Sequence, residues 1–301
     1  MDKRSIKESI KSKTFFRDVV LYIFMKIGFY SNYTRGLITM DRAYLKLKKR
    51  YEKKIKDFKV DEKIKQEESN FIWVCWLQGL ENAPKLVKKC YESVKRWYPD
   101  NDIVLITKEN FRDYVDIPEY IINKWENGII SNTHFSDILR AALLIEKGGL
   151  WLDATVWCTG NSWKKIKENK LFVYRNGWMD MEYINMASWL IYSQSNNHIL
   201  LLTQELLYDY WKRNNYLVNY FLFHMFFKMA TEKYSDEWKL VPYYSQIDNH
   251  LLANELMNNF DEKRYDEIKY LTNFHKLTYK LPIDKNKNKN KTTFYDKIIE
   301  E

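Results

Sequence analysis

The stretch SDILRAALLIEKGGLWLDATV, residues 136–156, indicates a helix, a glycine stop and a short strand in immediate succession. Its first half is apolar on almost every side, which is typical of a helix buried beside a sheet. Ser136 is a candidate N-cap, and Gly148 and Gly149 can end the helix because glycine readily adopts the left-handed conformation. The strand then delivers Asp153 to its carboxyl end, where open α/β sheets bind their ligands. The stretch therefore predicts an α/β fold with a binding site at that edge.

Two charged residues share one face of the predicted helix. Asp137 and Arg140 are three residues apart, so their side chains are neighbours on the helix surface. Asp137 would lie in the first turn, where the helix dipole favours an ionised carboxylate. These two residues could bind a ligand together, or they could form an internal ion pair that only holds the helix against a loop. Asp153 could likewise bind a ligand, or it could be a helix cap or a member of a buried salt bridge.

The pattern Ser-Asp-x-x-Arg, then Gly-Gly, an aromatic residue, a hydrophobic residue and Asp, resembles the signature of family 32 glycosyltransferases of the GT-A type. The resemblance is strongest to their capsular polysaccharide synthesis subgroup. Further similar segments follow in the expected order, and they are FIWVCWLQGLENAPKLVKKCYESV (71–94), NMASWLIYSQSNNHILL (185–201), LVNYFLFHMFF (217–227) and HKLTYK (275–280). The resemblance implies a GT-A-like open, mostly parallel sheet flanked by helices, in an enzyme that takes a nucleotide-sugar donor.

The resemblance also implies roles for the acidic residues. Asp137 and Arg140 would hold the donor sugar, and Asp153 would be the first carboxylate of a D-x-D element that contacts ribose, sugar hydroxyls or a divalent cation. In this chain the element is Asp153-Ala154-Thr155, so a threonine replaces the second carboxylate. Binding of Mn²⁺ or Mg²⁺ would be weakened but still possible, because Mg²⁺ commonly uses only one or two protein carboxylates.

The segment HKLTYK resembles an element that supplies a further metal or phosphate contact in many GT-A enzymes. By that resemblance, Asp153, Thr155 and His275 are the candidate metal ligands, and Lys276 and Lys280 offer charge to the diphosphate. A structural histidine is the alternative for His275.

The first strand offers a place for the nucleotide base. The carboxyl end of this strand has an aromatic residue, Trp73 or Trp76, together with Gln78 and Gly79. The backbone and the aromatic face could hold the base there. Core packing is the alternative for either tryptophan, because one face of such a strand is buried.

The later segments stand where family members build the acceptor side. Asn185, which is also a candidate donor contact, and Trp189 open one of these segments, and residues 220–227 form another. Core packing is their alternative role, and we interpret His224 as a core histidine. Asn219 stands where the family pattern has an aspartate.

The composition of the 301-residue chain fits a folded enzyme with anionic ligands. It is 46% hydrophobic and 17% aromatic, which excludes a disordered chain, and its formal net charge is +9. The cysteines Cys75, Cys90 and Cys158 are widely spaced and odd in number, so the sequence supports neither a zinc ribbon nor a disulfide framework. A reducing cytoplasm is the simplest setting.

Three regions are expected along the chain, namely a helical region (1–69), a catalytic domain (70–284), and a basic linker with a short tail (285–301). The window Val19–Tyr30 is too short to span a bilayer. Its apolar residues beside basic ones suggest a surface contact with anionic lipid, which would place the protein on the inner face of the cell membrane. The basic residues are Lys3, Arg4, Lys7, Lys11, Lys13 and Arg17. A helix packed on the catalytic domain is the alternative.

Local patterns predict the first elements of these regions. Residues 42–66 indicate an exposed connecting helix with few buried residues, whereas 71–77 and 102–107 indicate strands. Residues 84–95 indicate a helix, and 111–125 a segment broken near Pro118.

The leading hypothesis is a retaining transferase that moves a hexose from a nucleotide sugar to a lipid-linked oligosaccharide during synthesis of capsular or related surface polysaccharide. A non-catalytic assembly subunit derived from such an enzyme is an alternative, suggested by Thr155 and Asn219. A nucleic-acid-binding protein is the other alternative, suggested by the positive charge and the aromatic residues. No nucleic-acid partner is expected, however, because the basic residues concentrate at the two ends and the middle contains no usual RNA- or DNA-binding motif.

Overall fold

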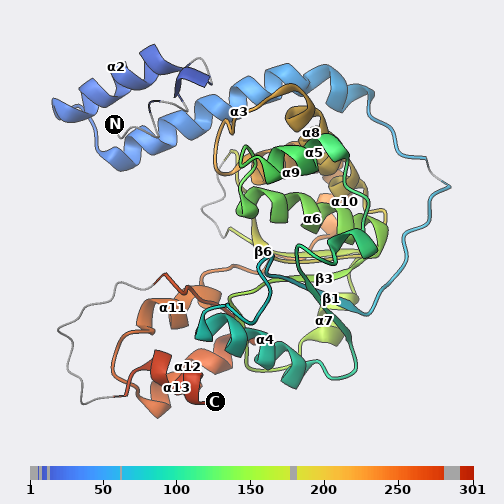
Figure 1. Cartoon of the computed structure of the whole chain (residues 1–301), viewed down its shortest axis with the longest axis vertical. Helices are drawn as coiled ribbons and strands as arrows, with labels where there is room; N and C mark the ends of the chain where they lie inside the picture. The colour runs from blue at the N-terminus through green and yellow to red at the C-terminus, as the bar shows by residue number, and fades with distance from the viewer. Residues whose placement is uncertain (1–5, 7–8, 12–13, 62, 177–181, 281–291) are drawn as a thin grey trace.

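A computed structural model describes residues 6, 9–11, 14–61, 63–176, 182–280 and 292–301. Figure 1 shows an α/β body between a pair of N-terminal helices and a group of short helices near the C-terminus. The predicted basic linker, Lys285 to Lys291, lies outside the described residues, as do Lys3, Arg4, Lys7 and Lys13 of the predicted lipid contact.

The body is built on a five-stranded sheet with the strand order β2-β1-β3-β6-β5. Its strands are β1 (Phe71–Cys75), β2 (Asp102–Ile106), β3 (Gly149–Asp153), β5 (Leu171–Arg175) and β6 (Met186–Ser193). β1 pairs in parallel with β2 and β3, whereas β6 runs antiparallel to both of its neighbours, β3 and β5. Four of the five strands therefore point the same way, which confirms the predicted mostly parallel α/β sheet.

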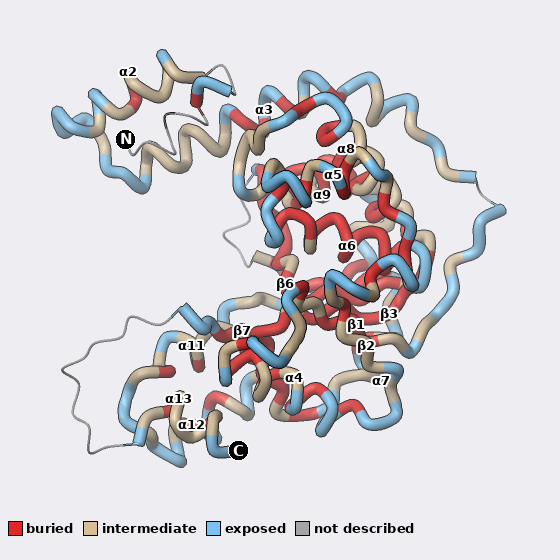
Figure 2. The backbone as a smooth tube through the Cα atoms, in the orientation of Figure 1, coloured by how far each residue is buried: buried red, intermediate tan, exposed pale blue. Residues whose placement is uncertain are grey.

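Helices cover both faces of this sheet (Figure 1). One face carries α5 (Glu119–Glu126), α6 (Asn132–Glu146), α8 (His198–Arg213) and α9 (Leu222–Lys233), and the other carries α4 (Lys85–Trp97) and α7 (Trp163–Lys167). The red tube in Figure 2 marks the buried core on both sides of the strands. Strand alternation sorts the side chains, because Trp73 packs in the core of the first face while Ile72 and Val74 pack in that of the second.

Shorter elements complete the fold. A two-stranded antiparallel sheet joins β4 (Val156–Cys158) to β7 (Phe274–Lys276). The helices in the C-terminal part of the chain are α10 (Ser235–Leu240), α11 (Leu251–Glu255), α12 (Glu262–Leu271) and α13 (Phe294–Glu300), and 3₁₀ turns lie at Phe111–Asp113 and Asp248–His250.

Helix α6, which the sequence predicts from Ser136 onwards, begins earlier in the structure, at Asn132. Its N-cap is Ser131, whose hydroxyl accepts the His134 amide hydrogen bond, whereas Ser136 lies inside the helix and donates to the Thr133 carbonyl. The predicted cap at Ser136 is therefore wrong, and Asp137 lies beyond the first turn.

The glycine stop is confirmed. Gly148 and Gly149 have φ values of +66° and +101°. A Cβ atom on Gly149 would lie 2.4 Å from the Phe71 carbonyl oxygen. The absence of a side chain therefore lets β3 approach β1 closely.

The N-terminal helices are α2 (Phe15–Lys26) and α3 (Asn32–Asp57). The expectation of an exposed connecting helix over 42–66 is wrong in part, because α3 ends at Asp57 and its second half packs against α9. Ala43, Tyr44, Leu47 and Tyr51 are buried there. The spacing 44, 47, 51 places these side chains on one helix face, so the two tyrosines and Leu47 form its apolar surface. The many lysines of the helix make this periodicity hard to recognise in the sequence.

No described helix has the length and apolar character needed to cross a membrane. At the other end, α13 packs against α4 and buries Phe294 and Ile298. The C-terminal tail is thus a packed part of the fold.

Candidate active site

A cavity of about 550 Å³ opens at the carboxyl ends of β1 and β3. Cys75 and Asp153, the last residues of these strands, are partners in the sheet register, so they lie side by side on the cavity wall. α6 contributes Asp137 and Arg140 from one side, and β7 contributes Lys276 from the other. Asp137, Arg140 and Asp153 therefore converge on one open cavity, as the sequence predicts.

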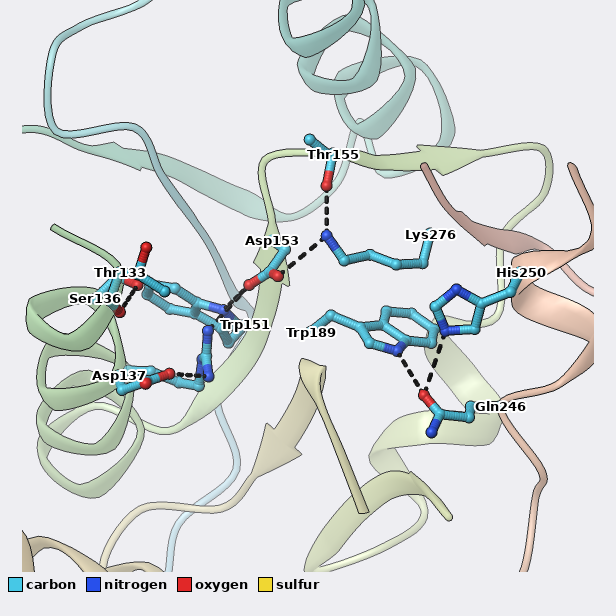
Figure 3. A network of polar contacts seen from close by, with 11 residues as sticks. Thr133, Ser136, Asp137, Trp151, Asp153, Thr155, Trp189, Gln246, His250 and Lys276 are labelled. Atoms are coloured by element: carbon cyan, nitrogen blue, oxygen red, sulfur yellow. Dashed lines mark hydrogen bonds and ion pairs between the residues drawn. The ribbon is translucent and has the colours of Figure 1, made fainter. Parts of the chain in front are cut away.

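A continuous network of charges joins these residues (Figure 3). Arg140 donates through Nη1 to Asp137 Oδ1 at 2.7 Å and through Nη2 to Asp153 Oδ1 at 3.0 Å. Lys276 Nζ lies 3.3 Å from Asp153 Oδ2, and it also donates to the Thr155 hydroxyl. Two carboxylates and two cations thus alternate along the wall.

The Arg140 side chain is only 3% exposed, while that of Asp153 is 28% exposed. The guanidinium group lies over the Trp151 ring, 4.8 Å from its centroid, and 5.5 Å from the Phe223 centroid. Trp151 Nε1 also donates to Asp153 Oδ1 at 3.1 Å. Because the guanidinium is held from all these directions, it presents the Asp153 carboxylate to the cavity in a defined orientation.

Burial alone would raise the pKa of the Asp153 carboxyl, but the charges of Lys276 and Arg140 outweigh that effect and hold the pKa below its usual value. Asp153 is therefore ionised at neutral pH. An ionised carboxylate at this position can accept hydrogen bonds from the hydroxyl groups of a ligand.

Strand alternation separates two neighbouring candidates on β7. Lys276 faces the cavity, whereas His275 is fully buried on the opposite side, with Nε2 3.0 Å from the Thr159 hydroxyl. Burial lowers the pKa of His275 to about 4. His275 is therefore a structural histidine in the protein interior. From this position it cannot make the metal or phosphate contact that the resemblance implies.

The two candidate tryptophans also separate, because Trp73 lies within β1 whereas Trp76 follows its last residue. Trp73 is fully buried and its indole nitrogen donates to the Gly148 carbonyl, so the core alternative describes it. Trp76 lines the cavity and forms an edge-to-face pair with Tyr279 at 5.6 Å between ring centroids. Gln78 lines a different hollow, near Lys108 and Trp125, and the structure does not bring it to the cavity.

Two further candidates, and the Asn219 position of the family pattern, lie outside the cavity lining. Gly79 follows Gln78 in the turn after β1 and has a φ of +73°. Asn185 is buried, and its side chain donates to the Thr231 hydroxyl at 3.0 Å. Asn219 accepts the Phe221 amide hydrogen bond and so shapes the turn before α9. Lys280, by contrast, lies on the cavity wall as expected.

Sequence reasoning underrated two residues near the start of α9. Tyr220 and His224 both line the cavity, although we interpreted His224 as a core histidine. Its Nδ1 atom is buried and has no hydrogen-bond partner among the described residues. Burial lowers the pKa of His224 to about 4 against the attraction of Asp137, so its imidazole is neutral at neutral pH.

Other lining residues were not expected at all. Thr133 and Ser136 extend the polar face of α6, and their spacing from Asp137 and Arg140 follows the helical period within an otherwise apolar helix. That pattern could have revealed them. His250 also lines the cavity, with Nε2 3.3 Å from Gln246 Oε1 (Figure 3), and no sequence pattern marks it.

The described residues do not fit a resident divalent cation. Among them, no group of three or more histidine, cysteine or acidic side chains is arranged to hold a metal ion. Asp153 is the one carboxylate of the D-x-D position, and it is already paired with Arg140 and Lys276. Thr155 adds only a neutral oxygen, which accepts from Lys276.

A family model matches almost the whole chain. The model describes capsular polysaccharide synthesis proteins, and its match covers residues 26–298. The chain belongs to the capsular polysaccharide synthesis protein family. The matched region begins at the last residue of α2 and ends within α13, so it includes α3 and most of α13 as well as the sheet and its cavity.

A solved structure titled PaToxG Glycosyltransferase resembles this capsular polysaccharide synthesis protein at 15% sequence identity and a TM-score of 0.41. The match covers 69% of this chain and 84% of that chain. A comparison with curated proteins found no match.

Proposed function

We propose that this capsular polysaccharide synthesis protein is a glycosyltransferase that moves a hexose from a nucleotide sugar to a hydroxyl group of a growing, lipid-linked oligosaccharide. One observation carries the proposal. Asp137, Arg140 and Asp153 form a continuous network on the wall of an open cavity, beside Lys276 and Lys280. The cavity lies at the carboxyl edge of the sheet, which is the usual ligand position in α/β folds.

Each part of such a donor has a partner in the cavity. Trp76 and Tyr279 offer aromatic faces to the base, and Lys276 and Lys280 offer positive charge to the diphosphate. The oxygens of Asp137 and Asp153 are acceptors for sugar or ribose hydroxyls.

The charge balance favours an anionic ligand. Within the network the two carboxylates, Asp137 and Asp153, offset the two cations, Arg140 and Lys276. Lys280 adds one further positive charge at the exposed rim. A diphosphate therefore meets surplus positive charge rather than the carboxylates alone.

The proposed transfer retains the configuration at the anomeric carbon. The acceptor oxygen forms its bond to that carbon on the face from which the diphosphate departs, and the breaking C–O bond leaves its electron pair on the diphosphate. The acceptor proton passes to a departing phosphate oxygen, so the reaction needs no protein base. Burial raises the pKa of the Cys75 thiol to about 12, so this cavity thiol is protonated at neutral pH and is not a nucleophile.

The test is to incubate the purified protein with a panel of nucleotide sugars, with and without Mn²⁺, and to measure donor hydrolysis, transfer and binding. We expect at least one donor to bind and turn over. Asp153→Asn should lower turnover by about 100-fold or more while the circular dichroism spectrum is unchanged, because preorganised charge at a reacting centre is typically worth that much. The absence of binding and turnover across the whole panel would refute the proposal.

We also propose that α2 and the turn after it rest on an anionic membrane surface, where a lipid-linked acceptor would be found. Large apolar side chains are exposed there, most of all Phe16 at 86%, Phe29 at 72% and Ile27 at 62%. Basic residues lie nearby, namely Arg17 and Lys26 on α2 and Arg35 in the first turn of α3. Basic side chains beside exposed apolar ones favour binding to anionic lipid.

Vesicle sedimentation tests this surface. The protein should sediment with phosphatidylserine-containing vesicles more than with phosphatidylcholine vesicles, and combined Phe16→Glu and Phe29→Glu substitutions should abolish the difference. Tyr270→Glu is a matched control, since Tyr270 is 91% exposed on α12, at the opposite end of the molecule. Equal sedimentation of the double variant and the unsubstituted protein would contradict the assignment.

A further inference from the structure

The Lys276 ammonium group occupies a definite position between two residues of the D-x-D element. Its Nζ lies 3.3 Å from Asp153 Oδ2 and donates to the Thr155 hydroxyl (Figure 3). Backbone pairing holds it there, because Val156 is the register partner of Lys276 and the Leu277 amide donates to the Thr155 carbonyl at 2.9 Å. Backbone hydrogen bonds thus hold Lys276 beside the turn that carries the Asp153 carboxylate and the Thr155 hydroxyl.

We propose that Lys276 is the built-in cation of this site, standing between Asp153 and Thr155 in place of a divalent ion, so that a nucleoside diphosphate binds without metal. The inference rests on the proposed function, since it concerns how the donor diphosphate is held.

The surroundings of Asp153 support a resident ammonium rather than a metal ion. Oδ1 of this carboxylate accepts from both Arg140 and Trp151, and Oδ2 faces Lys276. A divalent cation at Oδ2 would have to displace the ammonium and would stand close to a buried guanidinium, which repels it. Thr155 offers such an ion no negative charge, whereas a lysine needs only one carboxylate and hydrogen-bond acceptors.

The ammonium group also retains capacity for a ligand. It has three N–H donors, and its two contacts with Asp153 and Thr155 leave one for the cavity. Its side chain is 22% exposed, so solvent and ligand can reach it. When the bond between sugar and diphosphate breaks, the diphosphate gains negative charge, and a fixed ammonium beside it stabilises that charge.

Calorimetric titration with uridine diphosphate and guanosine diphosphate tests the inference in excess EDTA and again in Mn²⁺. The unsubstituted protein should bind one of the two with equal affinity in both buffers. In EDTA, Lys276→Ala should weaken that affinity by about 10- to 100-fold, which corresponds to one charge-assisted hydrogen bond. Lys276→Arg, which keeps the charge, should lose less than Lys276→Ala.

Lys239→Ala is the matched control, because Lys239 pairs with Asp236 on the exposed surface of α10 and should leave binding unchanged. Electron paramagnetic resonance of Mn²⁺ gives a second readout, independent of turnover and of nucleotide binding. Lys276→Ala removes one positive charge beside Asp153, so this variant should bind Mn²⁺ more tightly than the unsubstituted protein, although Arg140 remains paired with the carboxylate.

Two results would overturn the inference, and they are distinguishable. Diphosphate binding that requires Mn²⁺ and is equal in the unsubstituted protein and in Lys276→Ala would refute the built-in cation while leaving the proposed function intact. If neither diphosphate binds in either buffer and the nucleotide-sugar panel also gives no binding, the proposed function fails, and the role of Lys276 fails with it.

Discussion

Arg140 is the residue on which the geometry of the site depends most. Its buried guanidinium group links Asp137 on α6 to Asp153 at the end of β3, and it is packed over Trp151. A helix and a strand are therefore joined through one planar fork of donors. A lysine has the same charge but not this fork, so the two residues are not interchangeable here.

Arg140→Lys should accordingly lower kcat for sugar transfer by about 10- to 100-fold, because a primary amine cannot hold both carboxylates in the same orientation. Steady-state kinetics with the donor found in the panel provides the measurement. Arg175→Lys is the control, since Arg175 is another buried arginine, stacked on Trp238 outside the cavity lining. Equal kcat values in the unsubstituted protein and Arg140→Lys would show that the linkage has no part in turnover.

At the scale of elements, local patterns predicted the first part of the α/β body well. The strands at 71–77 and 102–107, the helix at 84–95 and the break near Pro118 correspond to β1, β2, α4 and the 3₁₀ turn with α5. These elements have clear start and stop signals. Ser136 gave a misleading signal because Ser131 could also serve as the cap, and only the backbone conformation at each serine decides between them.

Site residues were predictable where local periodicity determines their direction and unpredictable where tertiary pairing does. Asp137 and Arg140 follow from helical spacing. The choice between His275 and Lys276 depends on which face of β7 meets the cavity, and that is set by the pairing of β7 with β4, more than 100 residues earlier in the chain. Trp73 and Trp76 pose the same problem, and only the structure shows that Trp73 is buried within β1 and that Trp76, beyond its end, lines the cavity.

The contact between β1 and β3 gives a prediction at this scale. Gly149→Ala should reduce the free energy of unfolding by about 2–4 kcal/mol, because a Cβ would meet the Phe71 carbonyl oxygen at 2.4 Å and the residue has a positive φ. Urea denaturation monitored by circular dichroism would measure it. Gly36→Ala, in α3 with open space around it, should be neutral or slightly stabilising. Similar effects of the two substitutions would contradict the close approach described here.

At the scale of the whole molecule, one helix near each end of the chain packs on the body. The second half of α3 lies on α9, which carries His224, and α13 lies on α4, which follows β1. The first half of α3 and α2 extend beyond the body (Figure 1). The composition of residues 42–66 alone predicts a charged, exposed connecting helix, because the lysines of this segment outnumber the four residues of α3 that are buried.

The overall stability should depend on pH through buried histidines. Burial lowers the pKa of both His224 and His275 from an ordinary 6.5 to about 4, so between these values the unfolded chain binds protons that the folded chain does not. The stability from each histidine is therefore fully present above pH 6.5 and declines as the pH falls, by up to about 1.4 kcal/mol per pH unit. The lowered pKa of Asp153 acts only at lower pH, below its ordinary value of 3.8.

His275→Gln isolates one of these contributions, because glutamine can still bond to Thr159 but does not titrate. Urea unfolding at several pH values between 6.5 and 4.5 should show a shallower loss of stability for the variant than for the unsubstituted protein. Parallel losses would mean that His275 titrates equally in the folded and unfolded states.

A crystal structure of the protein with the nucleotide sugar that binds best in the panel would show whether this cavity holds the donor. We expect the diphosphate beside Lys276 and Lys280, the base against Trp76 and Tyr279, and the sugar at Asp137 and Asp153. A nucleotide sugar bound elsewhere on the molecule, with this cavity filled only by solvent, would contradict this expectation.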